Sequence, residues 1–234
     1  MTLALDVAPV MVAYDVAHFL AGMMLVASFM LLYQDRIFAV LNTFAAQAML
    51  LALAVAWQGY VHHHPDLFIT AAMAFGLKGI VIPLALNRMV VRLGIHRDVD
   101  QAVNVASSMF LGLGLTSLAL LLVLKVTPGA SSFTREGLAL ALAVILLGFL
   151  MMITRRNAVT QIVGFMSIEN GLILAATGAR GMPLVVEVSV AFSVLIALFV
   201  FAVFVFRIRE RFDSVEIEYL DRVRGDRRVQ GDGR

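Results

Sequence analysis

Residues 137–178 carry the pattern that decides the fold. They read GLALALAVILLGFLMMI, then TRRN at 154–157, then AVTQIVGFMSIENGLILAATG. Each apolar segment is close to the roughly 20 residues that a helix needs to cross a bilayer. The polar TRRN segment between them is typical of a short loop. This stretch therefore predicts two consecutive membrane-spanning helices that run in opposite directions.

The rest of the chain has the same apolar character. Of its 234 residues, 61% are hydrophobic and 15% are charged, whereas a soluble domain has about 25% charged residues. This composition excludes a disordered chain, a nucleic-acid-binding domain and an ordinary soluble enzyme. The absence of Cys excludes disulfides, iron–sulfur clusters bound by cysteine and thiol catalysis. We expect no cofactor, metal site or catalytic residue in this chain, and we interpret His62, His63 and His64 as part of an external turn.

Working outward from residues 137–178, the sequence predicts an all-α, polytopic membrane helix bundle. The expected seven spans are 9–33, 37–60, 66–91, 104–124, 137–153, 158–178 and 183–206. We divide the chain into an N-terminal transmembrane region at 1–153, two further spans at 154–206 and a basic cytoplasmic tail at 207–234.

The basic residues predict the orientation of this bundle. With seven spans, 14 of the 18 Lys and Arg residues fall on one side, three fall on the other and Lys78 lies inside a span. Loops rich in Lys and Arg stay in the cytoplasm. We therefore expect the N-terminus outside and the C-terminus in the cytoplasm.

Ionisable side chains inside the spans are the candidate functional residues, because each costs at least about 2.5–3.5 kcal/mol to insert at bilayer depth. Glu169 follows Arg156 by 13 residues, which places it about 20 Å from the membrane edge. Its protonation is expected to change during a working cycle, or else it is a fixed hydrogen-bonding or ion-pairing group. Gly164, Gly171 and Gly178 form a seam about 150° away on the same helix. We expect a neighbouring helix on that seam and a different neighbour at Glu169.

Lys78 is also predicted near mid-membrane, shortly before Pro83, which removes a backbone donor and frees a carbonyl. It serves in proton exchange or neutralises a carboxylate, and both roles predict that it lies close to Glu169 or Glu187. Glu187 lies near the start of the seventh span, where it lines an access route or sits at a helix N-terminus. Asp15 and His18 share one helix face, and they pair with each other or line an outer half-channel.

Residues Thr154 to Val215 resemble the K subunit of respiratory complex I. The similarity rests on Ile153 to Asn157, on Ile162 to Phe165, on a membrane Glu and on an arginine-rich exit followed by Asp213 to Val215. When the segments are aligned, the K subunit's mid-helix Glu falls on Met166, so Glu169 lies about one turn further along. The second K-subunit Glu falls near Ala191, again about one turn from Glu187. With its longer N-terminal region and Lys78, the chain is similar to the hydrogenase-4 component E family.

That resemblance implies a membrane subunit of a hydrogenase or formate hydrogenlyase type of complex, related to complex I, in the cell inner (plasma) membrane. Its partners would be the other membrane subunits, including antiporter-like ones. The implied role is a link in a proton-translocation path, with Glu169 as the central carrier, Lys78 as charge partner or relay, and Glu187, Asp15 and His18 as access residues. Two alternatives are a subunit of a multisubunit cation/proton antiporter and a non-conducting structural subunit.

Overall fold

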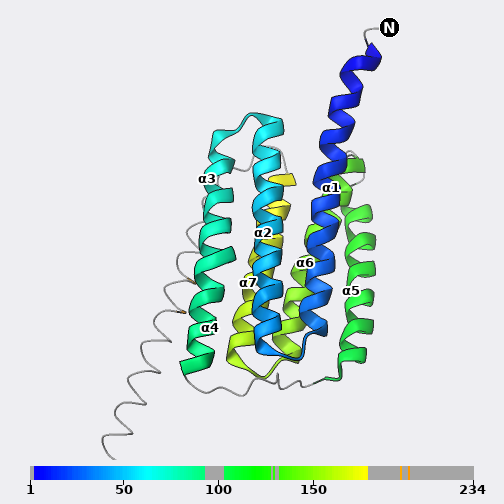
Figure 1. Ribbon diagram of the computed structural model, residues 1–234. Coiled ribbons are helices and arrows are strands. Elements are labelled where there is room, and N and C mark those ends of the chain that lie inside the picture. Colours follow the sequence, from blue (N-terminus) through cyan, green and yellow to red (C-terminus); the bar gives the residue numbers. More distant parts are fainter. Residues whose placement is uncertain are drawn as a thin grey trace, which may run out of the picture. The chain divides into compact units, whose positions relative to one another are not determined.

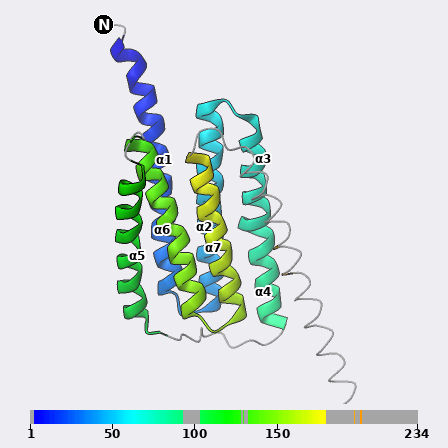
Figure 2. The same ribbon diagram turned by 180° about the vertical axis from the view of Figure 1, so that it is seen from behind.

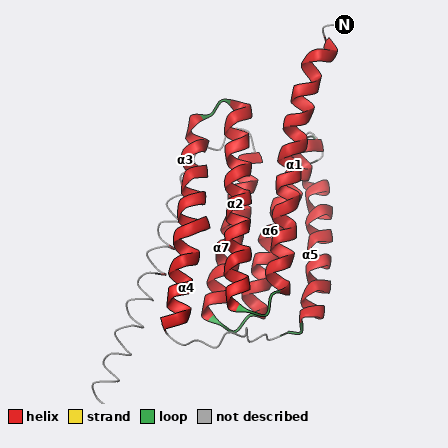
Figure 3. Ribbon diagram, in the orientation of Figure 1, coloured by secondary structure: helices red, strands yellow, loops and turns green. Residues whose placement is uncertain are grey.

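The computed structural model describes residues 3–92, 103–127, 129 and 132–178, together with Ile196 and Val200. The chain forms two compact units, residues 1–193 and 194–234. Only the first contains elements that are described, and all of these are helices (Figure 3).

The helices are long and joined by short loops. Their bounds are α1 Leu3–Tyr33, α2 Ile37–His62, α3 Pro65–Met73, the π-helix η1 Ala74–Val81, α4 Ile82–Arg92, α5 Val105–Val126, α6 Ser132–Thr154 and α7 Ala158–Gly178. Among the described residues, six spans are long and apolar enough to cross a membrane, with α3, η1 and α4 forming a single span. The predicted all-α membrane bundle is confirmed, and its first six spans agree with the expected ones. The seventh, 183–206, and the tail at 207–234 lie outside the described residues, so the predicted domain division and orientation stay predictions.

The helices form two layers. Helices α1, α2 and the α3–η1–α4 span make one layer, and α5, α6 and α7 make the other (Figures 1 and 2). Helix α2 joins the layers by packing on α7, and α6 joins them by packing on α1. Of the six spans α7 is the most buried and α5 the least. The residues of α7 that sequence analysis singled out therefore lie inside the bundle.

The third span changes helix type in its middle. From Ala74 to Val81 the backbone is π-helical, and the Ile82 N–H donates to the Leu77 carbonyl, five residues back. Pro83 follows directly; it has no N–H, and in an α-helix its ring clashes with the carbonyl four residues earlier. The proline therefore disfavours α-helical backbone in the preceding turn. The sequence predicted a freed carbonyl at this point but not a π-helix.

Arg155 joins the two loops at one end of the bundle. Its side chain is buried, and Nη2 donates to the carbonyl oxygens of Leu32 at 2.6 Å and Gln34 at 2.9 Å. Leu32 lies in the last turn of α1 and Gln34 directly follows the helix, so no further helical turn satisfies these carbonyls. Burial lowers the pKa of the Arg155 guanidinium and the Asp35 carboxylate opposes this shift, but an arginine stays charged. One arginine of the TRRN loop thus caps α1, in addition to its predicted topological role.

The glycine seam of α7 brings its backbone against that of α6. A β-carbon added at Gly171 would lie 3.0 Å from the Ile145 nitrogen and 3.1 Å from the Ala141 oxygen. One added at Gly164 would lie 3.1 Å from the Met152 nitrogen. The expected close approach at this seam is confirmed, and the neighbouring helix is α6.

We predict that Gly171→Ala destabilises the bundle by about 1–3 kcal/mol, because the added methyl group forces α6 and α7 apart. Gly114→Ala on α5 is the matched control, since a β-carbon there meets nothing within 4 Å and alanine favours a helix by up to about 1 kcal/mol. Thermal unfolding of the purified protein in detergent, followed by circular dichroism, measures both. Equal stability of the two variants would contradict the close contact.

Candidate functional site

The centre of the candidate site is an ion pair between Lys78 and Glu169. The Lys78 Nζ atom lies 3.0 Å from Glu169 Oε1. The two residues are only 1% and 3% exposed. Lys78 comes from the π-helical turn of the third span and Glu169 from the middle of α7. The predicted proximity of these two residues is confirmed.

Two amide side chains extend the polar cluster from Lys78. Lys78 Nζ donates to Asn170 Oδ1 at 3.1 Å, and Asn170 Nδ2 donates to Gln47 Oε1 at 3.2 Å. Both amides are 0% exposed. Gln47 lies on α2, so its bond to Asn170 joins α2 to α7. Lys78 therefore has an acceptor in addition to its carboxylate partner.

Two serines complete the cluster beyond Gln47. Gln47 Nε2 donates to Ser28 Oγ at 2.8 Å and to Ser167 Oγ at 2.9 Å. Ser28 Oγ in turn donates to the Met24 carbonyl at 2.9 Å, within α1. The hydrogen-bonded chain thus runs from an ammonium group on η1 to a backbone carbonyl on α1.

Six side chains therefore form one buried polar cluster, contributed by α1, α2, η1 and α7. They are Ser28, Gln47, Lys78, Ser167, Glu169 and Asn170, all 3% exposed or less. A buried ammonium is tolerated only when it is paired and hydrogen-bonded. Among the described residues, this cluster supplies the Lys78 ammonium with both a carboxylate partner and a hydrogen-bond acceptor.

Asp15 and His18 of α1 do not pair with each other in the structure. His18 Nε2 lies 3.3 Å from Glu136 Oε2 of α6, and His18 Nδ1 lies 3.0 Å from the Tyr14 carbonyl. Asp15 is exposed. The partner that the structure gives His18 is thus Glu136 rather than Asp15. Glu136 was missed because sequence analysis began the fifth span at residue 137, whereas α6 begins at Ser132. Glu187 lies outside the described residues.

Sequence reasoning gave no role to three members of the cluster, Ser28, Ser167 and Asn170. The available signal was the polar run at 167–170, where Ser167, Glu169 and Asn170 interrupt an apolar helix. Neutral polar side chains are common in membrane helices and often bond within their own helix. The sequence therefore gave no reason to choose these over other serines and amides.

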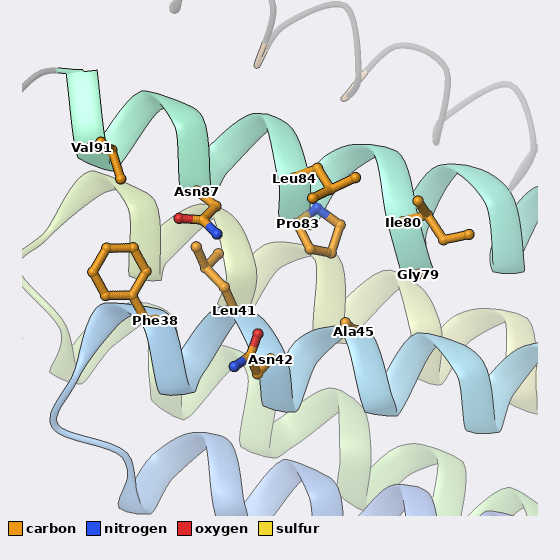
Figure 4. A pocket seen from close by; sticks show the side chains of 10 residues that line it. All are labelled: Phe38, Leu41, Asn42, Ala45, Gly79, Ile80, Pro83, Leu84, Asn87 and Val91. Carbon is orange, nitrogen blue, oxygen red and sulfur yellow. The ribbon is translucent and has the colours of Figure 1, made fainter.

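A groove lies beside the cluster, between α2 and the η1–α4 segment. Its volume is about 630 Å³, and its lining includes Gly79 and Pro83. The side chains of Asn42 and Asn87 point into it from the two helices (Figure 4). Lys78 is not part of the lining. Within the described residues, no three His, Asp or Glu side chains gather as metal ligands.

Comparison with known proteins finds relatives along almost the whole chain. The chain is 30% identical to the Mycobacterium tuberculosis protein Rv0085, described as uncharacterized, over 88% of this chain and 94% of that protein. It is 26% identical to hydrogenase-4 component E of Escherichia coli K12, over 88% of this chain and 96% of that protein. The proteins of the same name from Escherichia coli O157:H7 and Shigella flexneri give the same values. No protein-family model matches the chain, and no solved structure gives a significant match.

We predict that Lys78→Met destabilises the bundle by about 3–5 kcal/mol, because it leaves the Glu169 carboxylate buried without its cation. Adding Glu169→Gln to this variant should recover part of the loss, since the uncompensated charge is then gone. Lys125→Met, at an exposed position of α5, is the control and should change stability by less than about 0.5 kcal/mol. Thermal unfolding of these three variants and of Glu169→Gln alone measures the coupling. If the losses at Lys78 and Glu169 simply add, the two side chains do not depend on each other.

Proposed function

We propose a function on the premise that the chain belongs to the family of the mycobacterial protein Rv0085 and is a more distant homologue of hydrogenase-4 component E. It is an integral subunit of a hydrogenase-type, complex-I-related assembly in the cell inner (plasma) membrane. Within this assembly it contributes a step in a proton-translocation path. Electron transfer belongs to partner subunits, since this chain has no Cys with which to hold iron–sulfur clusters.

The observation that carries this proposal is the buried contact between Lys78 and Glu169. At 3.0 Å, a proton on the ammonium can move to the carboxylate, which leaves a neutral amine beside a neutral acid. In water the charged pair is strongly favoured, but burial disfavours charges and brings the two forms closer in free energy. The protons of such a pair belong to both groups together. The pair can therefore take up a proton from one side and release it to another.

The similarity to hydrogenase-4 component E supports the proposal that this step takes place in a hydrogenase-type complex. Hydrogenase-4 component E is named as a component of a hydrogenase, and the match covers 96% of its length. Ionisable residues inside membrane spans are rare, and they mark ion pathways and proton relays. In the proposal Glu169 is the central carrier and Lys78 is its charge partner, while Glu187, Asp15 and His18 remain candidates for access.

A second candidate function is a non-conducting structural subunit. It is favoured by the hydrogen bonds of Gln47 and Asn170, which hold four spans together, through α1, α2, η1 and α7, whether or not a proton moves. In that case the cluster specifies which helices pack together. The two functions differ in what happens when the charge is removed and the contacts are kept.

We predict that Glu169→Gln leaves the complex assembled but lowers coupled proton movement at least about tenfold, because an amide keeps a hydrogen-bond acceptor for Lys78 but cannot carry the proton. The measurement is proton uptake by proteoliposomes that contain the purified complex, with subunit composition checked in parallel. Asp66→Asn, the same chemical change at an exposed position of α3, should leave proton movement unchanged.

Normal proton movement by an assembled Glu169→Gln complex would contradict the proposed proton path and would support the structural function. Proton movement that depends on sodium, in a purified complex without redox activity, would instead assign the chain to a cation/proton antiporter.

A further inference from the structure

The Asn170 amide offers two opposite ends to its neighbours. Its oxygen attracts an ammonium group, whereas its NH₂ group repels one. The oxygen is the end that meets Lys78, at 3.1 Å. Something in the surrounding structure must therefore hold the amide in this direction, since a half-turn of its side-chain torsion would exchange the two ends.

The direction is fixed from α1. The Ser28 hydroxyl donates its single proton to the Met24 carbonyl at 2.9 Å. Towards Gln47 it can then offer only a lone pair, and Gln47 presents Nε2 to it at 2.8 Å. Ser167 Oγ lies on the same side and receives the other Nε2 bond at 2.9 Å. The NH₂ end of Gln47 is thus held by two acceptors.

The same constraint passes on to Asn170. Because the NH₂ group of Gln47 faces the two serines, its Oε1 atom faces Asn170. Asn170 must therefore donate a hydrogen bond to it, from Nδ2 at 3.2 Å. Asn170 then has its oxygen free for Lys78. Each bond in this chain is possible in only one direction once the first is set.

We infer that Ser28 and Gln47 are positioning residues, which act through Asn170 to keep a carbonyl oxygen on Lys78 and hold its Nζ against Glu169. This inference rests on the proposed function, in which Lys78 and Glu169 exchange a proton. After the proton has moved to Glu169, the neutral amine still donates to Asn170 and accepts from the carboxylic acid. The reacting atoms therefore stay in place in both forms of the pair.

No other ionisable side chain of the described helices lies at the depth of the pair. Around it, α2 carries such groups only near one end, α1 carries them in its first half and at its last residue, and α6 carries them in its first turns. They are Tyr60 and His62 on α2, Asp6, Tyr14, Asp15, His18 and Tyr33 on α1, and Arg135 and Glu136 on α6. The third span adds Asp66, Arg88 and Arg92 at its two ends. Among the titratable groups of the described helices, Lys78 is therefore the one placed to exchange a proton with Glu169.

The test is an infrared titration of the full chain in lipid bilayers. The band of Glu169 is identified as the part of the carboxyl absorption that Glu169→Gln removes. We expect Ser28→Ala to shift the midpoint of this band by about one pH unit, because the acceptor on Lys78 is no longer held in place. Ser28→Thr keeps a hydroxyl that bonds to the carbonyl four residues back, and should restore the midpoint of the unchanged protein.

Ser117→Ala is the matched control. Ser117 donates to the Leu113 carbonyl at 2.9 Å, as Ser28 does to Met24, but it is exposed on α5 and has no contact with the cluster. It should leave the midpoint unchanged. Thermal unfolding of each variant is measured alongside, so that a loss of stability is not mistaken for a change in titration.

Gln47→Leu breaks the same chain at its next member and provides a second measurement if Ser28→Ala does not fold. We expect a shift of similar size, and no further shift when the two changes are combined, because both act through Asn170. An unchanged midpoint in these variants, or shifts that add, would overturn the inference. Since the titration needs no proton pumping, this outcome is distinct from a failure of the proposed function, which the proteoliposome experiment on Glu169→Gln detects.

Discussion

The arrangement of the bundle depends on the cost of keeping the Lys78 ammonium away from water. Lipid tails are as apolar as leucine, so apolar contact alone gives membrane helices little reason to choose one neighbour over another. A buried cation does give such a reason, because it is tolerated only with a carboxylate and further acceptors around it. Lys78 finds these on α7, at Glu169 and Asn170. The third span is thereby tied to α7 as well as to α2, on which its backbone packs.

Helix α7 satisfies several neighbours because its surface is divided among them. At 100° per residue, Ser167 lies about 50° from the glycine seam, Asn170 about 110° and Glu169 about 210° in the same direction, which is about 150° in the other. The seam meets α6, Ser167 and Asn170 meet α2, and Asn170 and Glu169 meet Lys78 on η1. Asn170 can therefore contact both Gln47 and Lys78. The close approach of α6 at the seam leaves the rest of the circumference of α7 for polar contacts.

The sequence predicted the features whose cost is large and local. Glu169 and Lys78 could be chosen because a charge inside a span is expensive, and the glycine seam because a repeat of seven keeps one helix face. The π-helix at 74–81 was missed because Pro83 predicts that an α-helical hydrogen bond is lost, but not which backbone conformation replaces it. Ser28 and Asn170 were missed because a membrane serine or amide is worth only about 0.6 kcal/mol on average. The hydrogen-bond partners of such a side chain depend on which helices pack together, and the sequence pattern did not predict that packing.

The same hydrogen bonds that make the cluster stable also limit where a proton can go. Along the branch through Asn170 and Gln47 each link is an amide, which has no proton to lose near neutral pH, and the branch ends on the backbone carbonyl of Met24. A proton exchanged between Lys78 and Glu169 has no titratable group to move to in that direction. The branch thus holds Lys78 and Glu169 in place and offers no proton route on that side of the pair. A proton path through the pair must leave by another face, along η1 or around α7 beyond Glu169. A stable, hydrogen-bonded cluster is therefore compatible with the proposed proton movement, since the side that it makes rigid is one along which no proton would travel.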